Sequence, residues 1–353
     1  DYAMDPRVVN NPLPGYSVRD ALFAIPSMQL SLPTADMFST ASGIWANTLS
    51  SGPAWERECS LEMILPNGAS GDTAFQENCI VEPHGGSSRN PWRMQKHSLR
   101  ITFRSSVGPG TLSYPLFPES PVTDFNKLIL RACFTDSWGL VSWAPTRYRP
   151  NDSQYLRDRW MKETFRAMGQ PSTYGTYCHL YINGLYMGLF NPTERLESEH
   201  LVEHFGGQEA DWEINADFAT PGARWSAMMA LTNYADFPPY LDLANFADYI
   251  LLHIFADCED WPSHNGNAAT NAALGFPYHF FVWDQEIALD NHAMNRIDSA
   301  AGVGALFQKM RTFPEFRLLF ADRARKHLFN GGALTSAAAG QRYLQLAGII
   351  DQA

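Results

Sequence analysis

Three oxygen-bearing side chains in the last third of the sequence have types and spacing that suit metal-dependent phosphoryl transfer. Asp260 and Asn265 lie in the segment DWPSHN, where proline and a following glycine predict a loop, and Asp284 follows an apolar strand predicted over residues 278–283. In protein kinases, one Asp orients the substrate hydroxyl, an Asn five residues later holds a metal ion, and a later Asp binds the metals that bridge the nucleotide phosphates. Mg²⁺ prefers such hard oxygen ligands. The order of helix, loop and strand-end Asp therefore fits this chemistry.

The first half of the chain contains further elements in the order that a kinase requires. A glycine-serine loop over residues 85–88 precedes Lys96, a helix is predicted over residues 153–168, and Asn183-Gly184 between two apolar strands predicts a hairpin. In kinases this order corresponds to the phosphate loop, the strand lysine, the αC helix and the strands before the hinge. The strings G-x-G-x-x-G, V-A-I-K, H-R-D and D-F-G are all missing. An ordinary protein kinase is therefore excluded as a close relative.

Several ordered motifs resemble the CotH kinase family, the spore coat protein H-like atypical kinases. They are HGGSSRNPWRMQKHSLRITF, YLRDRWMKETFRAMG, YINGLYMGLFNPTERLE, DWPSHN and FFVWDQE. The resemblance extends from about Met28 to the C-terminus and is strongest to large exported bacterial members. It implies that Asp260 is the catalytic-loop acid, that Asn265 and Asp284 are metal ligands, and that Lys96 contacts the nucleotide phosphates.

The sequence also departs from the family pattern. Many relatives carry Asn two residues before the loop Asp, where this chain has Cys258, and the common Lys-Lys-Ser string is reduced here to one lysine, Lys96. The acidic partner of that lysine stays open between Asp158 and Glu163, which both lie in the predicted helix.

The distribution of predicted elements indicates an α+β chain with two lobes. Residues 1–55 are rich in Pro, Ser and Gly and predict an irregular N-terminal extension with one short strand. Residues 56–193 predict a β-rich lobe with one αC-like helix, and residues 194–353 predict a helical lobe that contains the catalytic loop and a single strand. The resemblance implies that these lobes form an atypical protein-kinase-like bilobal fold.

Composition excludes some classes of protein and some kinds of site. The formal net charge is −11, which argues against nucleic acid as a partner because phosphate backbones favour a basic surface. The sequence contains no uncharged apolar stretch long enough to predict a membrane span. The five cysteines form no C-x-x-C pair, so a zinc site is not predicted, but Cys59 and Cys79 could form a disulfide in an oxidising compartment.

Together, these features predict an ATP-dependent protein kinase that uses Mg²⁺ or Mn²⁺. The resemblance implies transfer to Ser or Thr of secreted or surface proteins, a location outside the cytoplasm, and a chain that is part of a longer multidomain protein. Two alternatives stay open. Cys258 motivates a nucleotide-binding pseudokinase, and the acidic loop would also suit Ca²⁺ in a structural domain of an exported surface protein.

Overall fold

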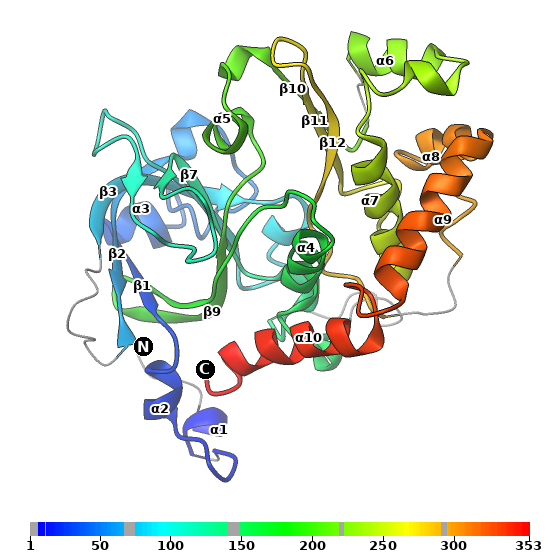
Figure 1. Ribbon diagram of the computed structural model, residues 1–353. Coiled ribbons are helices and arrows are strands. Elements are labelled where there is room, and N and C mark those ends of the chain that lie inside the picture. Colours follow the sequence, from blue (N-terminus) through cyan, green and yellow to red (C-terminus); the bar gives the residue numbers. More distant parts are fainter. Residues whose placement is uncertain (1–5, 11, 67–74, 140–148, 219–221, 291–294) are drawn as a thin grey trace. The chain divides into compact units, whose positions relative to one another are not determined.

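The structure is a computed structural model of the whole chain, and it describes residues 6–10, 12–66, 75–139, 149–218, 222–290 and 295–353. It contains both helices and sheets, so the predicted α+β class is confirmed. The chain divides into two compact units. Figure 1 labels most of the helices and strands named below. The first unit is Asp1–Tyr155 with Tyr174–Arg195 and Gln345–Ala353, and the second is Leu156–Thr173 with Leu196–Leu344. The kinase-like bilobal arrangement itself stays a prediction.

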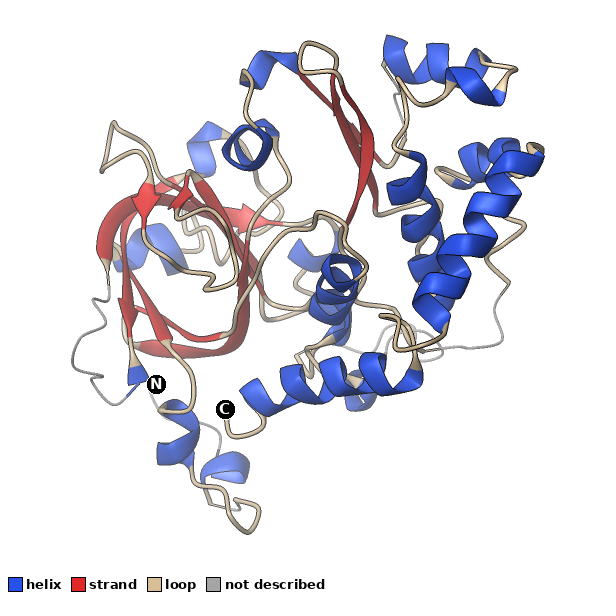
Figure 2. Ribbon diagram, viewed as in Figure 1, coloured by secondary structure: helices blue, strands red, loops and turns tan. Residues whose placement is uncertain are grey.

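The first unit is built around a closed β-barrel, whose strands are red in Figure 2. The strands pair in the order β1-β2-β3-β4-β7-β9-β8, and every pairing is antiparallel except the parallel contact between β1 and β8. Alternate residues such as Leu61 and Met63, or Leu99 and Ile101, point into the buried core. The bounds are β1 (Ser27–Ser31), β2 (Arg57–Ile64), β3 (Gln76–His84), β4 (Ser98–Thr102), β7 (Lys127–Arg131), β8 (Cys178–Ile182) and β9 (Leu185–Thr193).

The predicted hairpin is present as β8 and β9. Asn183 and Gly184 form its turn with φ values of 50° and 79°, and two successive positive φ angles define the turn that matches strand twist. The Asn183 side chain also accepts from Leu32 N–H and donates to the Leu32 carbonyl, so the turn is joined to the chain that follows β1.

The N-terminal segment, which was predicted to be an irregular extension, supplies a strand of the barrel. Strand β1 closes the barrel because it pairs with β2 on one side and with β8 on the other. The first unit also contains α1 (Pro6–Val9), α2 (Val18–Leu22), α3 (Thr34–Phe38) and the short pair β5 (Leu112–Ser113) and β6 (Asp124–Phe125). The dipeptide Asn67-Gly68, a type that predicts a reversal of the chain, lies between β2 and β3 but outside the described residues.

Helix α4 (Arg157–Ala167) begins four residues later than predicted. The reason is a contact from outside the helix, because Asp136 holds the preceding backbone in a non-helical path. Its carboxylate accepts from Gln154 N–H at 2.8 Å, and its carbonyl accepts from Tyr155 N–H at 3.1 Å. The helix ends at Ala167, one residue before its predicted end, and Gly169, a residue type that commonly stops helices, follows with a φ of 89°.

The second unit contains a three-stranded antiparallel sheet, so the prediction of a single strand among helices was wrong. Its order is β10 (Trp212–Ala216), β11 (Gly266–Asn271) and β12 (Phe276–Val282). Phe246 of α7 (Leu243–Phe255) packs on Phe280 of β12 and on Phe316 of α9 (Pro314–Leu328). The other helices are α5 (Ser198–Phe205), α6 (Ala223–Ala230), α8 (Gly304–Met310) and α10 (Ser336–Ile350).

The division into compact units differs from the predicted lobes in two places. The αC-like helix α4 belongs to the second unit, whereas the prediction put it in the β-rich lobe, and the last nine residues belong to the first unit. Among the described residues, no helix has both the length and the apolar character that crossing a bilayer requires.

Candidate functional site

The structure brings Asn265 and Asp284 together in the second unit. Asn265 immediately precedes β11, and Asp284 lies two residues beyond β12. Because Gly266 pairs with Val282 in the register of these strands, the residues just outside the pair are neighbours. The Asn265 side-chain amide donates from Nδ2 to the Asp284 carbonyl at 2.9 Å. Two of the three predicted oxygen-bearing residues are therefore in direct contact.

Both residues have left-handed backbone conformations. The φ angle is 60° at Asn265 and 55° at Asp284. Asn and Asp adopt this conformation more readily than most side chains, but it still costs free energy that the surrounding contacts must offset. Such conformations turn the chain sharply at the strand ends, and they are often found where side chains are aimed at a ligand.

Asp260 lies in a compact turn after α7. Its carbonyl accepts from His264 N–H at 3.0 Å and from Ser263 Oγ at 3.2 Å. The segment just before it is joined to the chain that follows Asp284 by two backbone bonds, from Glu259 N–H to the Ile287 carbonyl and from Leu289 N–H to that of Ala256. The loop that carries Asp260 and the segment that follows Asp284 are thus held side by side.

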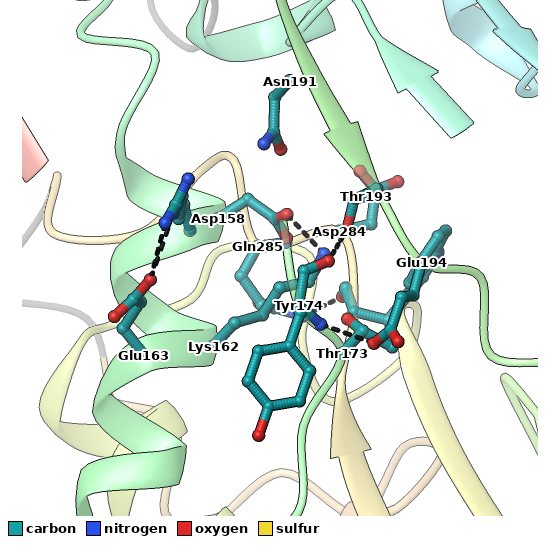
Figure 3. A network of polar contacts seen from close by, with 12 residues as sticks. Asp158, Lys162, Glu163, Thr173, Tyr174, Asn191, Thr193, Glu194, Asp284 and Gln285 are labelled. Atoms are coloured by element: carbon teal, nitrogen blue, oxygen red, sulfur yellow. Dashed lines mark hydrogen bonds and ion pairs between the residues drawn. The ribbon is translucent and has the colours of Figure 1, made fainter. Parts of the chain in front are cut away.

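A buried ion pair on α4 supports the same segment (Figure 3). Lys162 Nζ lies 2.9 Å from Asp158 Oδ2, and both side chains are at most 7% exposed. Asp158 Oδ1 accepts from Gln285 N–H at 2.9 Å, and the Lys162 ammonium lies 5.0 Å from the centre of the Trp283 ring. The residues on both sides of Asp284 are therefore positioned by α4.

Lys162 is a residue that the sequence reasoning missed. Its signal was the spacing of Asp158 and Lys162 four residues apart on one helix face. The two acidic candidates on this helix also differ in surroundings. Glu163 forms ion pairs with Arg159 and Arg166 along the helix itself, whereas Asp158 is buried against the segment that carries Asp284.

The segment that carries Asp260 packs on buried neutral side chains at the end of α7. His253, at the end of α7, donates from Nδ1 to the Tyr249 carbonyl at 2.7 Å and stacks on Trp261. Burial lowers the pKa of His253 to about 3, so this side chain is neutral. Burial likewise raises the pKa of the Cys258 thiol well above its usual value, with Asp257 adding to the effect. Cys258 is therefore a packed, protonated thiol.

Lys96 lies in the first unit, directly before β4. Its ammonium donates to the Leu189 carbonyl and lies 4.4 Å from the ring centre of Phe190 and 5.1 Å from that of Tyr155. A carbonyl oxygen and two aromatic faces stabilise a cation in this position. The phosphate-contacting role of Lys96 stays a prediction.

Cys59 and Cys79 are opposite each other on β2 and β3, with their sulfur atoms 3.4 Å apart. Both are free thiols here, and both are buried in the barrel.

Residues 81–221 match the family model described as CotH kinase protein. This segment, which is less than half of the chain, is similar to the CotH kinase family. The resemblance seen in the motifs is thus confirmed, and it indicates an atypical kinase-like function with general use of a nucleotide and a metal. The matched residues include Lys96 and α4, while Asp260, Asn265 and Asp284 follow the match. No match was found among curated proteins.

Proposed function

We propose that this CotH-related chain is an atypical protein kinase that transfers the γ-phosphate of ATP to Ser or Thr of a secreted or surface protein. The observation that carries the proposal is the contact between Asn265 and Asp284, which places an amide and a carboxylate side chain at adjacent strand ends. The family match supports the kinase-like class of function.

The side chains present suit a divalent cation. Asn265 uses its Nδ2 to hold the Asp284 backbone, which directs Oδ1, the atom that binds metals, away from that bond. Asn265 and Asp284 would hold Mg²⁺ or Mn²⁺, and a bound metal would neutralise charge on the phosphate oxygens. The donors are oxygens throughout, as these cations require.

The protein side chains act by positioning and proton transfer. The acceptor hydroxyl oxygen forms a bond to the γ-phosphorus, the bond from that phosphorus to the β–γ bridging oxygen breaks, and ADP leaves. Asp260 orients the hydroxyl and takes its proton, while Lys96 steadies the phosphates. Asp158 and Lys162 hold the backbone around Asp284, so we assign them as positioning residues.

The direct test uses ATP and a Ser-rich acceptor protein with each divalent metal in turn. A base positioned like Asp260 contributes about 10²–10⁴-fold in rate, so Asp260→Ala should lose measurable turnover while keeping the unfolding temperature of the wild type. Asp322→Ala is the matched control, because Asp322 is exposed on α9 of the same unit. We expect this control to keep full activity.

Two other outcomes would replace the proposal. Binding of ATP without phosphate on any protein would identify a pseudokinase. A thermal shift with Ca²⁺, and none with ATP and Mg²⁺, would identify a calcium-binding structural domain.

A further inference from the structure

The chain segment that leads into α7 binds the outer edge of strand β12. Among the described residues, β12 is the last strand of its sheet and pairs with β11 on one side. On its other side, Tyr278 N–H donates to the Tyr240 carbonyl at 2.7 Å, and the Tyr278 carbonyl accepts from Asp242 N–H at 3.1 Å. The segment before α7 therefore continues the hydrogen bonding of the sheet.

Asn245, in the first turn of α7, extends this contact with its side chain. Its Oδ1 accepts from Phe280 N–H at 2.6 Å, and its Nδ2 donates to the Phe280 carbonyl at 3.3 Å. Tyr278 and Phe280 are alternate residues of the strand, so their backbone polar groups point to the same edge. One buried amide thus pairs with both polar groups of one strand residue, and a buried N–H or carbonyl left unpaired would be costly.

A buried polar network fixes the orientation of this amide. Asn245 Nδ2 also donates to Gln170 Oε1 at 3.2 Å, and Gln170 Nε2 donates to Asp248 Oδ2 at 2.7 Å. Asp248 Oδ1 in turn accepts from Arg323 Nε at 2.7 Å. Because Nδ2 faces two acceptors and Oδ1 faces a donor, only one orientation of the Asn245 amide satisfies its partners.

From this contact, α7 and β12 lead in the same direction to the candidate site. A helix rises about 1.5 Å per residue and a strand about 3.3 Å, so the chain from Asn245 to Ala256 covers about 16 Å and that from Phe280 to Asp284 about 13 Å. At the far end the two elements meet again, where Leu289 N–H donates to the Ala256 carbonyl. The Asn245 contact therefore fixes how far each element extends toward the site.

The register between α7 and β12 determines how the candidate residues are placed. Asn265 and Asp284 move together, because they lie at the paired ends of β11 and β12, whereas Asp260 follows the end of α7. A slip of β12 by one residue would move Asp284 by about 3.3 Å and turn the backbone groups that bind Asn245 away from it. A misplacement of about 1 Å can already cost about 10²-fold in rate.

We propose that Asn245 is a positioning residue for phosphate transfer, which acts through the Phe280 backbone to place Asn265 and Asp284 relative to Asp260. The inference rests on the proposed function for the roles of these three residues. Loss of the Asn245 contact leaves Asn265 and Asp284 paired with each other. The transfer rate should therefore fall while the affinity for the metal changes little.

Distances between two spin labels test the placement without relying on activity. The labels are attached to His264→Cys, in the Asp260 loop, and to Leu274→Cys, in the turn between β11 and β12; both positions are exposed, and the native cysteines are buried. We expect a narrow distance distribution in the otherwise wild-type chain, and a shifted or broader one when Asn245→Leu is added. If Asn245→Leu does not fold, Asn245→Ser replaces it, because the smaller side chain leaves room for a water beside Phe280.

Gln170→Met is the matched control. It removes the neighbouring hydrogen bonds to Asn245 and Asp248 but leaves both contacts between Asn245 and Phe280. We expect a lower unfolding temperature with an unchanged distance distribution. A role in stability alone would change both variants alike.

Kinetics and metal binding then connect the placement to the reaction. For Asn245→Leu we expect kcat for transfer to fall at least tenfold, while Mn²⁺ affinity, measured by electron paramagnetic resonance with and without ATP, stays within about twofold of the wild type. Gln170→Met should keep both values.

A folded Asn245→Leu variant with the wild-type distance distribution, or with the wild-type kcat, would overturn the inference. A change of the same size in Gln170→Met would also overturn it. Failure of the proposed function gives a different result. If the wild type transfers no phosphate but the distance distribution still depends on Asn245, only the kinase activity is refuted.

Discussion

The buried ion pair between Asp158 and Lys162 predicts a large loss of stability when one partner is removed. Lys162→Met leaves the Asp158 carboxylate buried, with Gln285 N–H still bound at 2.9 Å. Removing one member of a buried pair costs about 3–5 kcal/mol, and the remaining hydrogen bond places this case near 3 kcal/mol. Loss of the contact with the Trp283 ring adds about 0.5–2 kcal/mol. The expected total is therefore about 3.5–5 kcal/mol.

Urea titration, followed by tryptophan fluorescence and by far-ultraviolet circular dichroism, measures this free energy of unfolding. The double variant Asp158→Asn/Lys162→Met removes both charges and keeps an oxygen for Gln285 N–H, so it should lose much less than Lys162→Met alone. Glu163→Gln on the same helix is the control. Its pairs with Arg159 and Arg166 are nearer the surface, and their loss should cost about 0.2–1 kcal/mol. Equal losses for Lys162→Met and Glu163→Gln would show that the Asp158–Lys162 pair stabilises the fold no more than a pair nearer the surface.

Three further predictions follow from buried groups. The folded pKa of His253 is about 3, below its unfolded value of about 6.5, so the unfolded state binds more protons between these two pH values. The stability that comes from neutral His253 should therefore be full above about pH 6.5, and the free energy of unfolding should fall by about 1.4 kcal/mol per pH unit below it. His253→Gln should reduce that slope in urea titrations at pH 4–7. Burial raises the pKa of Asp248, but hydrogen bonds from His327, Arg323 and Gln170 outweigh it and lower the pKa overall. The stability that comes from this carboxylate should be present above about pH 4 and be lost as the pH falls. In thermal melts across pH 2–6, the unfolding temperature of Asp248→Asn should depend less on pH than that of the wild type. All five cysteines are buried free thiols, so a thiol reagent should label none in the native protein and five after denaturation; labelling of only three would show that Cys59 and Cys79 are joined.

Local patterns in the sequence identified the elements whose structure is determined by the conformational preferences of a few residues. Asn183-Gly184 predicted the hairpin, and the Gly169 stop predicted the end of α4, because turn and cap chemistry depends on the residues themselves. The same reasoning predicted Asn265 and Asp284 as partners in one site, and their contact in the structure is consistent with this, although their function stays a prediction.

Strand β11 shows why other elements were missed. Its sequence, GNAATN, contains residues that are poor in strands, so no local signal predicts it. It forms because β10 and β12 pair with both of its edges and its central Ala268 and Ala269 are buried between them. In the same way, β1 closes the barrel by pairing with β8, which is about 150 residues away in the sequence. Local sequence patterns do not predict such a distant pairing.

The start of α4 and the Lys162 pair depend on tertiary contacts as well. Asp136 moves the helix start by binding the backbone of residues 154 and 155. The spacing of Lys162 from Asp158 is a weak signal in the sequence, because most lysines are solvated surface residues, and its burial beside Asp158 and Trp283 identifies its role.

The position of the label that is transferred from ATP is the decisive measurement for γ-phosphate transfer to Ser or Thr. Wild-type protein is incubated with a Ser-rich acceptor, a divalent metal and ATP labelled at either the γ- or the α-phosphorus, alongside Asp260→Ala and Asp284→Asn. We expect stable label on serine or threonine from γ-labelled ATP only, and none with either variant. Label from the α-position, or transfer by Asp260→Ala at the wild-type rate, would contradict it.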